Sequence, residues 1–149
     1  MSSSSNLGST VGPKIYVTYD DKDKGMSCDG AFGIRADTVS QATSSTTAVT
    51  LNSPGGVITT FAGTLAAQGV ESFVFTNSEL AGTAASPRTL WVTLQHYTGG
   101  GDPLICVTTR DETAATATIS VFNTHASAAL DANLKIRFYV SKEAFAAPL

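Results

Sequence analysis

The stretch Asn133–Ser141, Asn-Leu-Lys-Ile-Arg-Phe-Tyr-Val-Ser, decides the fold class. Apolar residues occupy every second position, and polar or amphipathic residues lie between them. This period-two alternation is typical of a β-strand with one face in a core and the other in solvent. Other stretches with strand character precede it, each followed by a turn, at Ser72–Asn77, Thr89–Tyr97, Leu104–Arg110 and Ala117–Asn123. No segment has convincing helical periodicity, so we predict an all-β protein.

The N-terminal half predicts additional strands at Lys14–Tyr19, Ala48–Leu51 and Val57–Leu65. Asp29-Gly30 is a turn signal and indicates a small hairpin or a bulged strand within Met26–Ala36. The Ser/Thr-rich segment Thr38–Thr47 is expected to be a surface loop. Together these segments give about eight strands, the number for two sheets packed face to face. We predict a single antiparallel, jelly-roll-like β-sandwich over residues 14–141.

The two ends of the chain differ in composition from the predicted sandwich. Residues 1–13 contain mainly Ser, Gly and Thr and are expected to form a flexible arm. The arm either frays or becomes ordered on a neighbouring subunit, and both alternatives stay open. Residues 142–149 are expected to form a short C-terminal tail. With 149 residues in total, the chain is long enough for one domain with its own core.

Composition argues against several classes of partner. The net charge is −3, and the nine Lys and Arg residues are scattered, so no basic patch for nucleic acid is expected. No run approaches the ~18 apolar residues that a membrane span requires. The N-terminus also lacks the basic and apolar regions of a signal peptide, so we expect synthesis in a cytoplasm. We predict no nucleic-acid partner and no membrane partner.

Candidate catalytic and metal-binding groups are isolated in the sequence. Neither His96 nor His125 has a carboxylate or a second His at ligand spacing. Cys28 and Cys106 match no paired zinc motif, and although a disulfide between them stays open, separate thiols on strands are favoured. The acidic turn Asp20–Gly25 lacks the closing Glu of a calcium loop. We predict no catalytic residue, no metal and no cofactor, and therefore a protein that is not an enzyme.

Several aromatic residues are predicted to face away from the core. By alternation, they lie opposite the Leu, Ile and Val positions of their strands, and they are Trp91, Tyr97, Phe122 and Tyr139. Either both faces of the sheet are covered within the monomer, or a neighbouring subunit covers the aromatic face. Exposed aromatic residues on adjacent strands are typical of a contact surface. A trimer around a threefold axis would bury such a face.

The C-terminal half also contains an ordered series of short motifs. A strand ending in Thr-Asn precedes an alternating strand, a Gly-rich loop, a strand ending in Asn, a short Ala/Leu loop and a terminal Leu-Lys-Ile-x-Phe-x-Val strand. The matching residues are Thr76-Asn77, Leu90–Leu94, Gly99–Gly101, Ile119–Asn123, Ala128–Leu130 and Leu134–Val140. Over roughly residues 60–141, the series resembles bacteriophage virion proteins with jelly-roll or knob-like sandwiches, among them capsid decoration (cement) proteins.

The resemblance implies a homotrimer on the capsid surface of a virion, synthesised in the host cytoplasm and bound to the major capsid protein. It transfers no catalytic residues. The expected subunit or capsid contacts are Leu7, Val11, Trp91, Tyr97, Phe122, Tyr139 and Phe145.

Two alternatives remain open. A receptor-binding knob of a head or tail fibre would have the same fold, but such a protein usually carries a long stalk. A non-viral carbohydrate-binding module would use Trp91 or Tyr97 to stack on a sugar.

Overall fold

The computed structural model describes residues 17–20, 25–28, 37–83 and 87–142. The chain divides into two units, residues 1–34 and residues 35–149. In the first unit, β1 (Val17–Asp20) and β2 (Gly25–Cys28) form an antiparallel hairpin. The predicted strand Lys14–Tyr19 overlaps β1. The predicted arm of residues 1–13, the turn at residues 29–30 and residues 143–149 of the tail lie outside the described residues.

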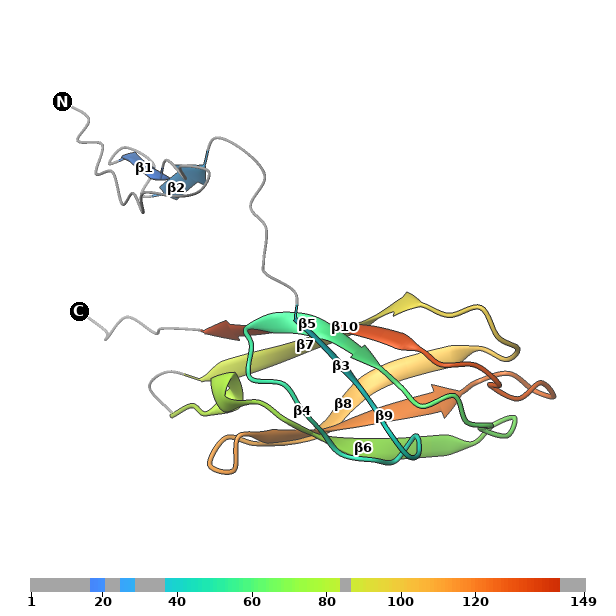
Figure 1. Ribbon diagram of the computed structural model, residues 1–149. Helices are drawn as coiled ribbons and strands as arrows, with labels where there is room; N and C mark the ends of the chain where they lie inside the picture. The colour runs from blue at the N-terminus through green and yellow to red at the C-terminus, as the bar shows by residue number, and fades with distance from the viewer. Residues whose placement is uncertain (1–16, 21–24, 29–36, 84–86, 143–149) are drawn as a thin grey trace. The chain divides into compact units, whose positions relative to one another are not determined.

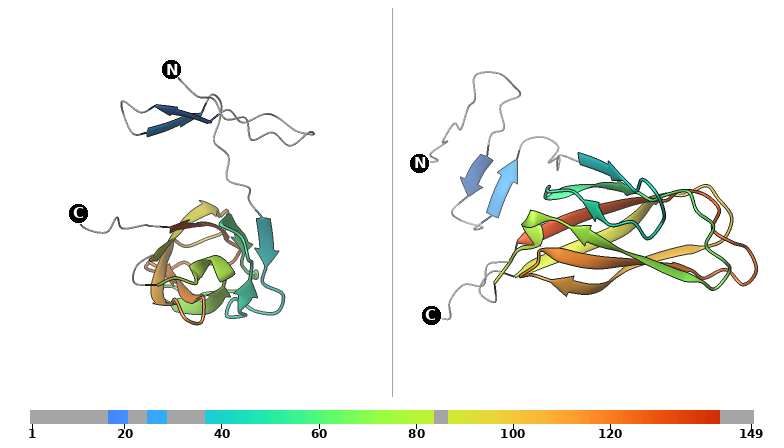
Figure 2. Two further views of the ribbon diagram at one scale, coloured as in Figure 1. Left: turned by 90° about the vertical axis from the view of Figure 1, so that its left-hand side faces the viewer. Right: turned by 60° about the horizontal axis from the view of Figure 1, so that its bottom comes forward.

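The second unit is a sandwich of two four-stranded sheets (Figures 1 and 2). Sheet I has the strand order β3 (Asp37–Ser40), β5 (Gly55–Thr59), β10 (Lys135–Lys142), β7 (Arg88–His96). Sheet II has the order β4 (Val49–Thr50), β6 (Val70–Thr76), β9 (Thr116–Asn123), β8 (Pro103–Asp111). One short 3-10 helix, η1 (Ser78–Leu80), follows β6. The predictions of an all-β chain and of a sandwich are therefore confirmed.

Both sheets are mixed, which corrects the prediction of an antiparallel, jelly-roll-like sandwich. β3 pairs with β5 in parallel, and β4 pairs with β6 in parallel, whereas the other pairings in the sandwich are antiparallel. The reason lies in the path of the chain. From β3 to β6, consecutive strands lie in alternate sheets. β5 therefore runs in the same direction as β3 in sheet I, and β6 runs in the same direction as β4 in sheet II.

Two predicted boundaries differ from the structure in the first half of the sandwich. β3 begins at Asp37, so part of the expected surface loop Thr38–Thr47 is a strand in which Val39 packs against the core. The predicted strand Val57–Leu65 ends at Thr59, and Leu65 makes only an isolated bridge to Leu130. The eight strands of the sandwich thus span residues 37–142, whereas the sequence predicted a domain that starts at residue 14.

The core lies between the two sheets and is formed by the inward-facing positions of their central strands. Its largest members are Ile58, Ile136 and Phe138 of sheet I and Phe73, Phe75 and Ile119 of sheet II, each at most 2% exposed. The rings of Phe75 and Phe138 meet across the sandwich with centroids 4.7 Å apart. Burial of each such side chain contributes about 1.5–3 kcal/mol, so these contacts hold the sheets together.

Candidate functional site

The Asn residue that ends β9 is a structural anchor. The Asn123 side chain is 2% exposed, and its amide donates to the carbonyls of Leu65, Ala66 and Ala128 at 3.2, 3.1 and 2.8 Å. Its Oδ1 atom accepts from the backbone N–H groups of Asp102 and His125, both at 3.2 Å. One side chain therefore ties together three loops at this end of the sandwich.

The Asn residue that follows β6 has a comparable role at the other end. The Asn77 side chain is fully buried, and its amide donates to the Ser53 carbonyl at 2.8 Å. Its Oδ1 atom accepts from the Glu79 N–H at 2.9 Å, which makes Asn77 the N-cap of η1. Both Asn residues of the motif series thus satisfy buried backbone groups and are not available to bind a partner.

Tyr97 belongs to the Gly-rich loop and does not lie on an outer face. Its ring packs against the core, and its hydroxyl donates to the Gly100 carbonyl and accepts from the Asp131 N–H. The Asp131 carboxylate accepts from the Gly100 N–H at 2.7 Å. Gly101 has φ of +75°, a value that favours glycine. Tyr97 and Asp131 therefore fix this loop.

The predicted orientation of Tyr97 was wrong because β7 has a β-bulge before its last residue. His96 pairs with Lys135, but Leu94 pairs with the next residue, Ile136, so Gln95 has no partner. The extra residue reverses the alternation beyond Leu94, and Tyr97 turns inward.

The two histidines occupy different environments. His125 accepts hydrogen bonds at Nδ1 from the backbone N–H groups of Ser127 and Ala128, at 3.1 and 2.7 Å, so it orders its own loop. His96 is exposed at the end of β7. The thiol of Cys106 is free and half-buried, and it lies on the outer face of β8 because its neighbours Ile105 and Val107 pack on the core.

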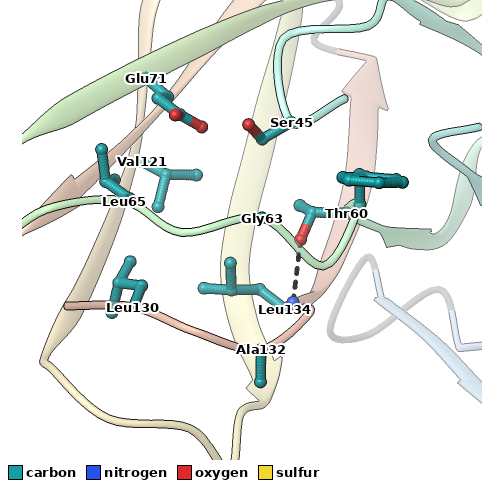
Figure 3. A pocket seen from close by; sticks show the side chains of 10 residues that line it. Ser45, Thr60, Gly63, Leu65, Glu71, Val121, Leu130, Ala132 and Leu134 are labelled. Atoms are coloured by element: carbon teal, nitrogen blue, oxygen red, sulfur yellow. Dashed lines mark hydrogen bonds between the residues drawn. The ribbon is translucent and has the colours of Figure 1, made fainter. Parts of the chain in front are cut away.

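A small groove opens at one side of the sandwich (Figure 3). Its walls are mainly apolar and include Leu65, Leu130 and Leu134, while the oxygens of Glu71 and Ser45 point toward one another across it. Two of the lining residues are hydrogen-bonded, since the Leu134 N–H donates to Thr60 Oγ1 at 2.9 Å. With a volume of ≈ 20 Å³, the groove has room for about one water molecule and not for an organic ligand.

The outer face of sheet II carries what we call the apolar row, Val70, Phe122 and Leu104. Phe122 lies opposite Val70 on one side and opposite Leu104 on the other, so the three residues stand side by side on β6, β9 and β8. Val70 and Leu104 are 54% and 55% exposed, and Phe122 is half-buried between them. The predicted outward direction of Phe122 agrees with this arrangement.

The outer face of sheet I carries a second apolar feature, the aromatic pair Trp91 and Tyr139. These residues lie directly opposite one another on β7 and β10 and are 57% and 41% exposed, which agrees with their predicted outward direction. The indole N–H donates a long hydrogen bond of 3.4 Å to Ser141 Oγ. A hollow of ≈ 160 Å³ adjoins the pair and is also lined by Thr93 and Arg137.

Sequence reasoning missed three of these surface residues. Val70 lies before the predicted strand Ser72–Asn77, although it is the first residue of β6. Leu104 and Arg137 lie at outward positions of predicted strands, so the same alternation could have found them. The predicted contacts Leu7, Val11 and Phe145 lie outside the described residues.

Within the described ranges, no three His, Cys, Asp or Glu side chains lie close enough to hold a metal ion. No helix in the part of the chain that the structure describes is long and apolar enough to cross a membrane. Comparisons with protein-family models, with curated proteins and with solved structures found no match to this chain.

Proposed function

We propose that the protein is a structural component of a bacteriophage virion, a homotrimer that decorates the outside of the major capsid lattice and stabilises the head. The observation that carries the self-association is the apolar row Val70–Phe122–Leu104. The virion assignment and the trimeric state rest on the resemblance of residues 60–141 to decoration proteins. The jelly-roll-like topology of those proteins is not needed for this proposal, because the contact surface belongs to one face of one sheet.

The apolar row has the form of the centre of a subunit interface. Neighbouring strands are ~4.8 Å apart, so the row extends for roughly 10 Å across three strands. Its two outer members, Val70 and Leu104, are more than half exposed in the single chain. Val74, 43% exposed, extends the apolar surface along β6. An apolar surface of this kind on a β-sheet is stabilised when another subunit removes it from water.

The surroundings of the row also suit contact between identical copies. The outward positions of the central strands hold no charged residue; they are Val70, Ser72, Val74 and Thr76 on β6 and Thr116, Thr118, Ser120 and Phe122 on β9. The hydroxyl of Ser120 is hydrogen-bonded to those of Ser72 and Thr108 at 2.8 and 3.0 Å. Three such faces would meet around a threefold axis without burying like charges, and depletion of charge is typical of interface centres.

Trimerisation would give attachment to the capsid its strength. Three copies present three identical contact sites, and once the first is bound the others bind at high effective concentration. Weak individual contacts thereby add up to a lasting attachment. We place the capsid contacts in the terminal segments, residues 1–13 and 142–149, which include Leu7, Val11 and Phe145.

The oligomeric state is the first test. Light scattering on the full chain should give the mass of a trimer. The double variant Val70→Ser/Leu104→Ser should give a monomer with unchanged circular dichroism, because both side chains are already largely exposed. Trp91→Ser, which removes an equally exposed residue from sheet I, is the matched control and should remain trimeric. A monomeric wild-type chain at micromolar concentration would refute the proposal.

The place in the virion is a separate test. Densitometry of purified particles should find hundreds of copies if the protein decorates the capsid. A few copies would support the receptor-binding knob instead. Deletion of residues 1–13 should lower occupancy on particles while leaving the trimer intact, and unchanged occupancy would remove the arm from the contact.

A further inference from the structure

The outer face of sheet I is basic, although the chain as a whole has a net charge of −3. Lys135 and Arg137 point outward from β10, since Ile136 and Phe138 between them are buried. The other outward positions of the four strands carry no Asp or Glu; they are Thr38, Ser40, Gly55, Val57, Thr59, Thr89, Trp91, Thr93, His96, Tyr139 and Ser141. Neither cation makes an ion pair or a hydrogen bond with another described residue.

The two cations and Tyr139 lie along one line on β10. Arg137 is two residues from Tyr139 on β10, or about 7 Å, and Lys135 is about 13 Å from it on the same face. Trp91 lies beside Tyr139 across the strand pair. The hollow of ≈ 160 Å³ is bordered by both rings and by Arg137, so a ligand in it would touch an apolar surface and a guanidinium at once.

This combination fits one class of ligand. A pyranose ring has an apolar C–H face that packs flat on an aromatic side chain, and its edge carries hydrogen-bonding groups. A guanidinium binds a carboxylate through two parallel hydrogen bonds. An aromatic surface next to an Arg that has no ion pair with any described residue therefore matches a sugar that carries a carboxylate, and the more distant Lys135 matches the next acidic unit of a chain.

We propose that the outer face of sheet I binds an acidic oligosaccharide containing uronic or sialic acid. One ring lies on Trp91 and Tyr139, its carboxylate binds Arg137, and the chain continues along β10 toward Lys135. The site uses the face opposite the apolar row, so it is compatible with the proposed trimer but does not depend on it. It would give a virion protein a second role, reversible adhesion to acidic surface polysaccharide.

Intrinsic fluorescence is a direct assay because the chain contains one Trp, Trp91. The full chain is titrated with trigalacturonate and, separately, with α2,8-linked trisialic acid. At least one should produce a saturable change at millimolar or lower concentration, and the one that does identifies the class of acid. Fully methyl-esterified trigalacturonate is the matched neutral ligand for the uronic case, and loss of the charge should weaken binding about tenfold or more.

Variants locate the site. Arg137→Gln should weaken binding about tenfold or more, because a charge-assisted hydrogen bond is lost. Tyr139→Ala should also weaken binding, and circular dichroism checks that it is folded. Lys142→Gln removes the same charge near the end of β10 and should bind like the wild type.

Three results of the binding experiments would overturn the proposal. They are no binding of either acid by the folded chain at millimolar concentration, equal binding of the esterified ligand, and unchanged binding by Arg137→Gln. A fall in mass of the Trp91→Ser variant would likewise overturn it, because this face would then be a contact between copies of the chain.

Discussion

Asn77 and Asn123 stand at opposite ends of one antiparallel strand pair, β6 and β9. Asn77 donates its backbone N–H to the Ala115 carbonyl at 3.0 Å, just before β9 begins. Asn123 donates its backbone N–H to the Gly69 carbonyl at 2.9 Å, just before β6 begins. Both side chains are buried and bonded to loops beyond the strands. The central ladder of sheet II is thus closed at both ends by the same residue type.

Replacement of Asn123 should be strongly destabilising. Asn123→Ala leaves several buried backbone groups without partners, and we expect the free energy of unfolding to fall by about 3 kcal/mol or more. Asn123→Asp should also be destabilising, because the carboxylate retains the acceptor but loses the donor and buries a charge. Urea unfolding of each variant and of the wild type measures the change in the free energy of unfolding.

Asn133→Ala is the control for this prediction, because Asn133 is exposed. It should change stability by no more than about 0.5 kcal/mol. Equal stability of the variants at positions 123 and 133 would contradict the anchoring role.

The hydroxyl of Tyr97 should be worth a measurable part of the stability. Tyr97→Phe keeps the ring against the core but removes the bonds to Gly100 and Asp131, and we expect a loss of about 1–2 kcal/mol. Tyr139→Phe removes a hydroxyl from an exposed ring and should cost less than about 0.5 kcal/mol. Thermal unfolding of the two variants side by side makes the comparison, and a reversed order would disprove it.

Gly56 and Gly63 should respond oppositely to a methyl group. A Cβ atom at Gly56 would lie 2.6 Å from the Asp37 carbonyl and 2.9 Å from the Phe138 ring. Gly56→Ala should therefore force β3 away from β5 and cost about 3 kcal/mol. At Gly63 the nearest atom is 3.5 Å away, so Gly63→Ala should be neutral or stabilising by up to about 1 kcal/mol. The denaturant midpoint should fall for Gly56→Ala and should stay the same or rise for Gly63→Ala, relative to the wild type.

Phe75 and Phe138 should be energetically coupled because they join the two sheets. Each change to Leu should destabilise by more than 1 kcal/mol, roughly, because a large buried ring is lost. In a double-mutant cycle, the coupling between the two rings should be about 0.5–1.5 kcal/mol. Additive effects, measured by equilibrium unfolding, would show that the sheets are held together elsewhere.

The sequence predicted the long strands better than the short ones. β6, β8, β9 and β10 have clear apolar positions because each packs a whole face on the core, and the predicted ranges overlap the observed ones. β3 was missed because Val39 is its only apolar residue, too little to produce an alternation. Its parallel pairing with β5 is set by the path of the chain between the sheets, which no local pattern encodes.

Whether a side chain is predicted to face outward depends on the phase of the apolar–polar alternation along its strand. Trp91 and Tyr139 could be placed on an outer face because the pattern continues without interruption around them. Tyr97 could not, because the bulge at Gln95 reverses the phase one residue before the strand ends. A bulge has no reliable signature in a single sequence, so the inward direction of Tyr97 could not be predicted from the alternation.

The pairing of Gly56 with β3 on one side and with β10 on the other determines how the sandwich would respond to a pulling force. Asp37, the first residue of β3, and Phe138, in the middle of β10, lie opposite Gly56 on its two sides, about 10 Å apart. Tension applied at residues 37 and 142 would peel strands from one end of sheet I, bond after bond, instead of shearing a whole ladder at once. A peptide joined genetically at either position would also emerge at that end, with the Gly-rich loop at the far end.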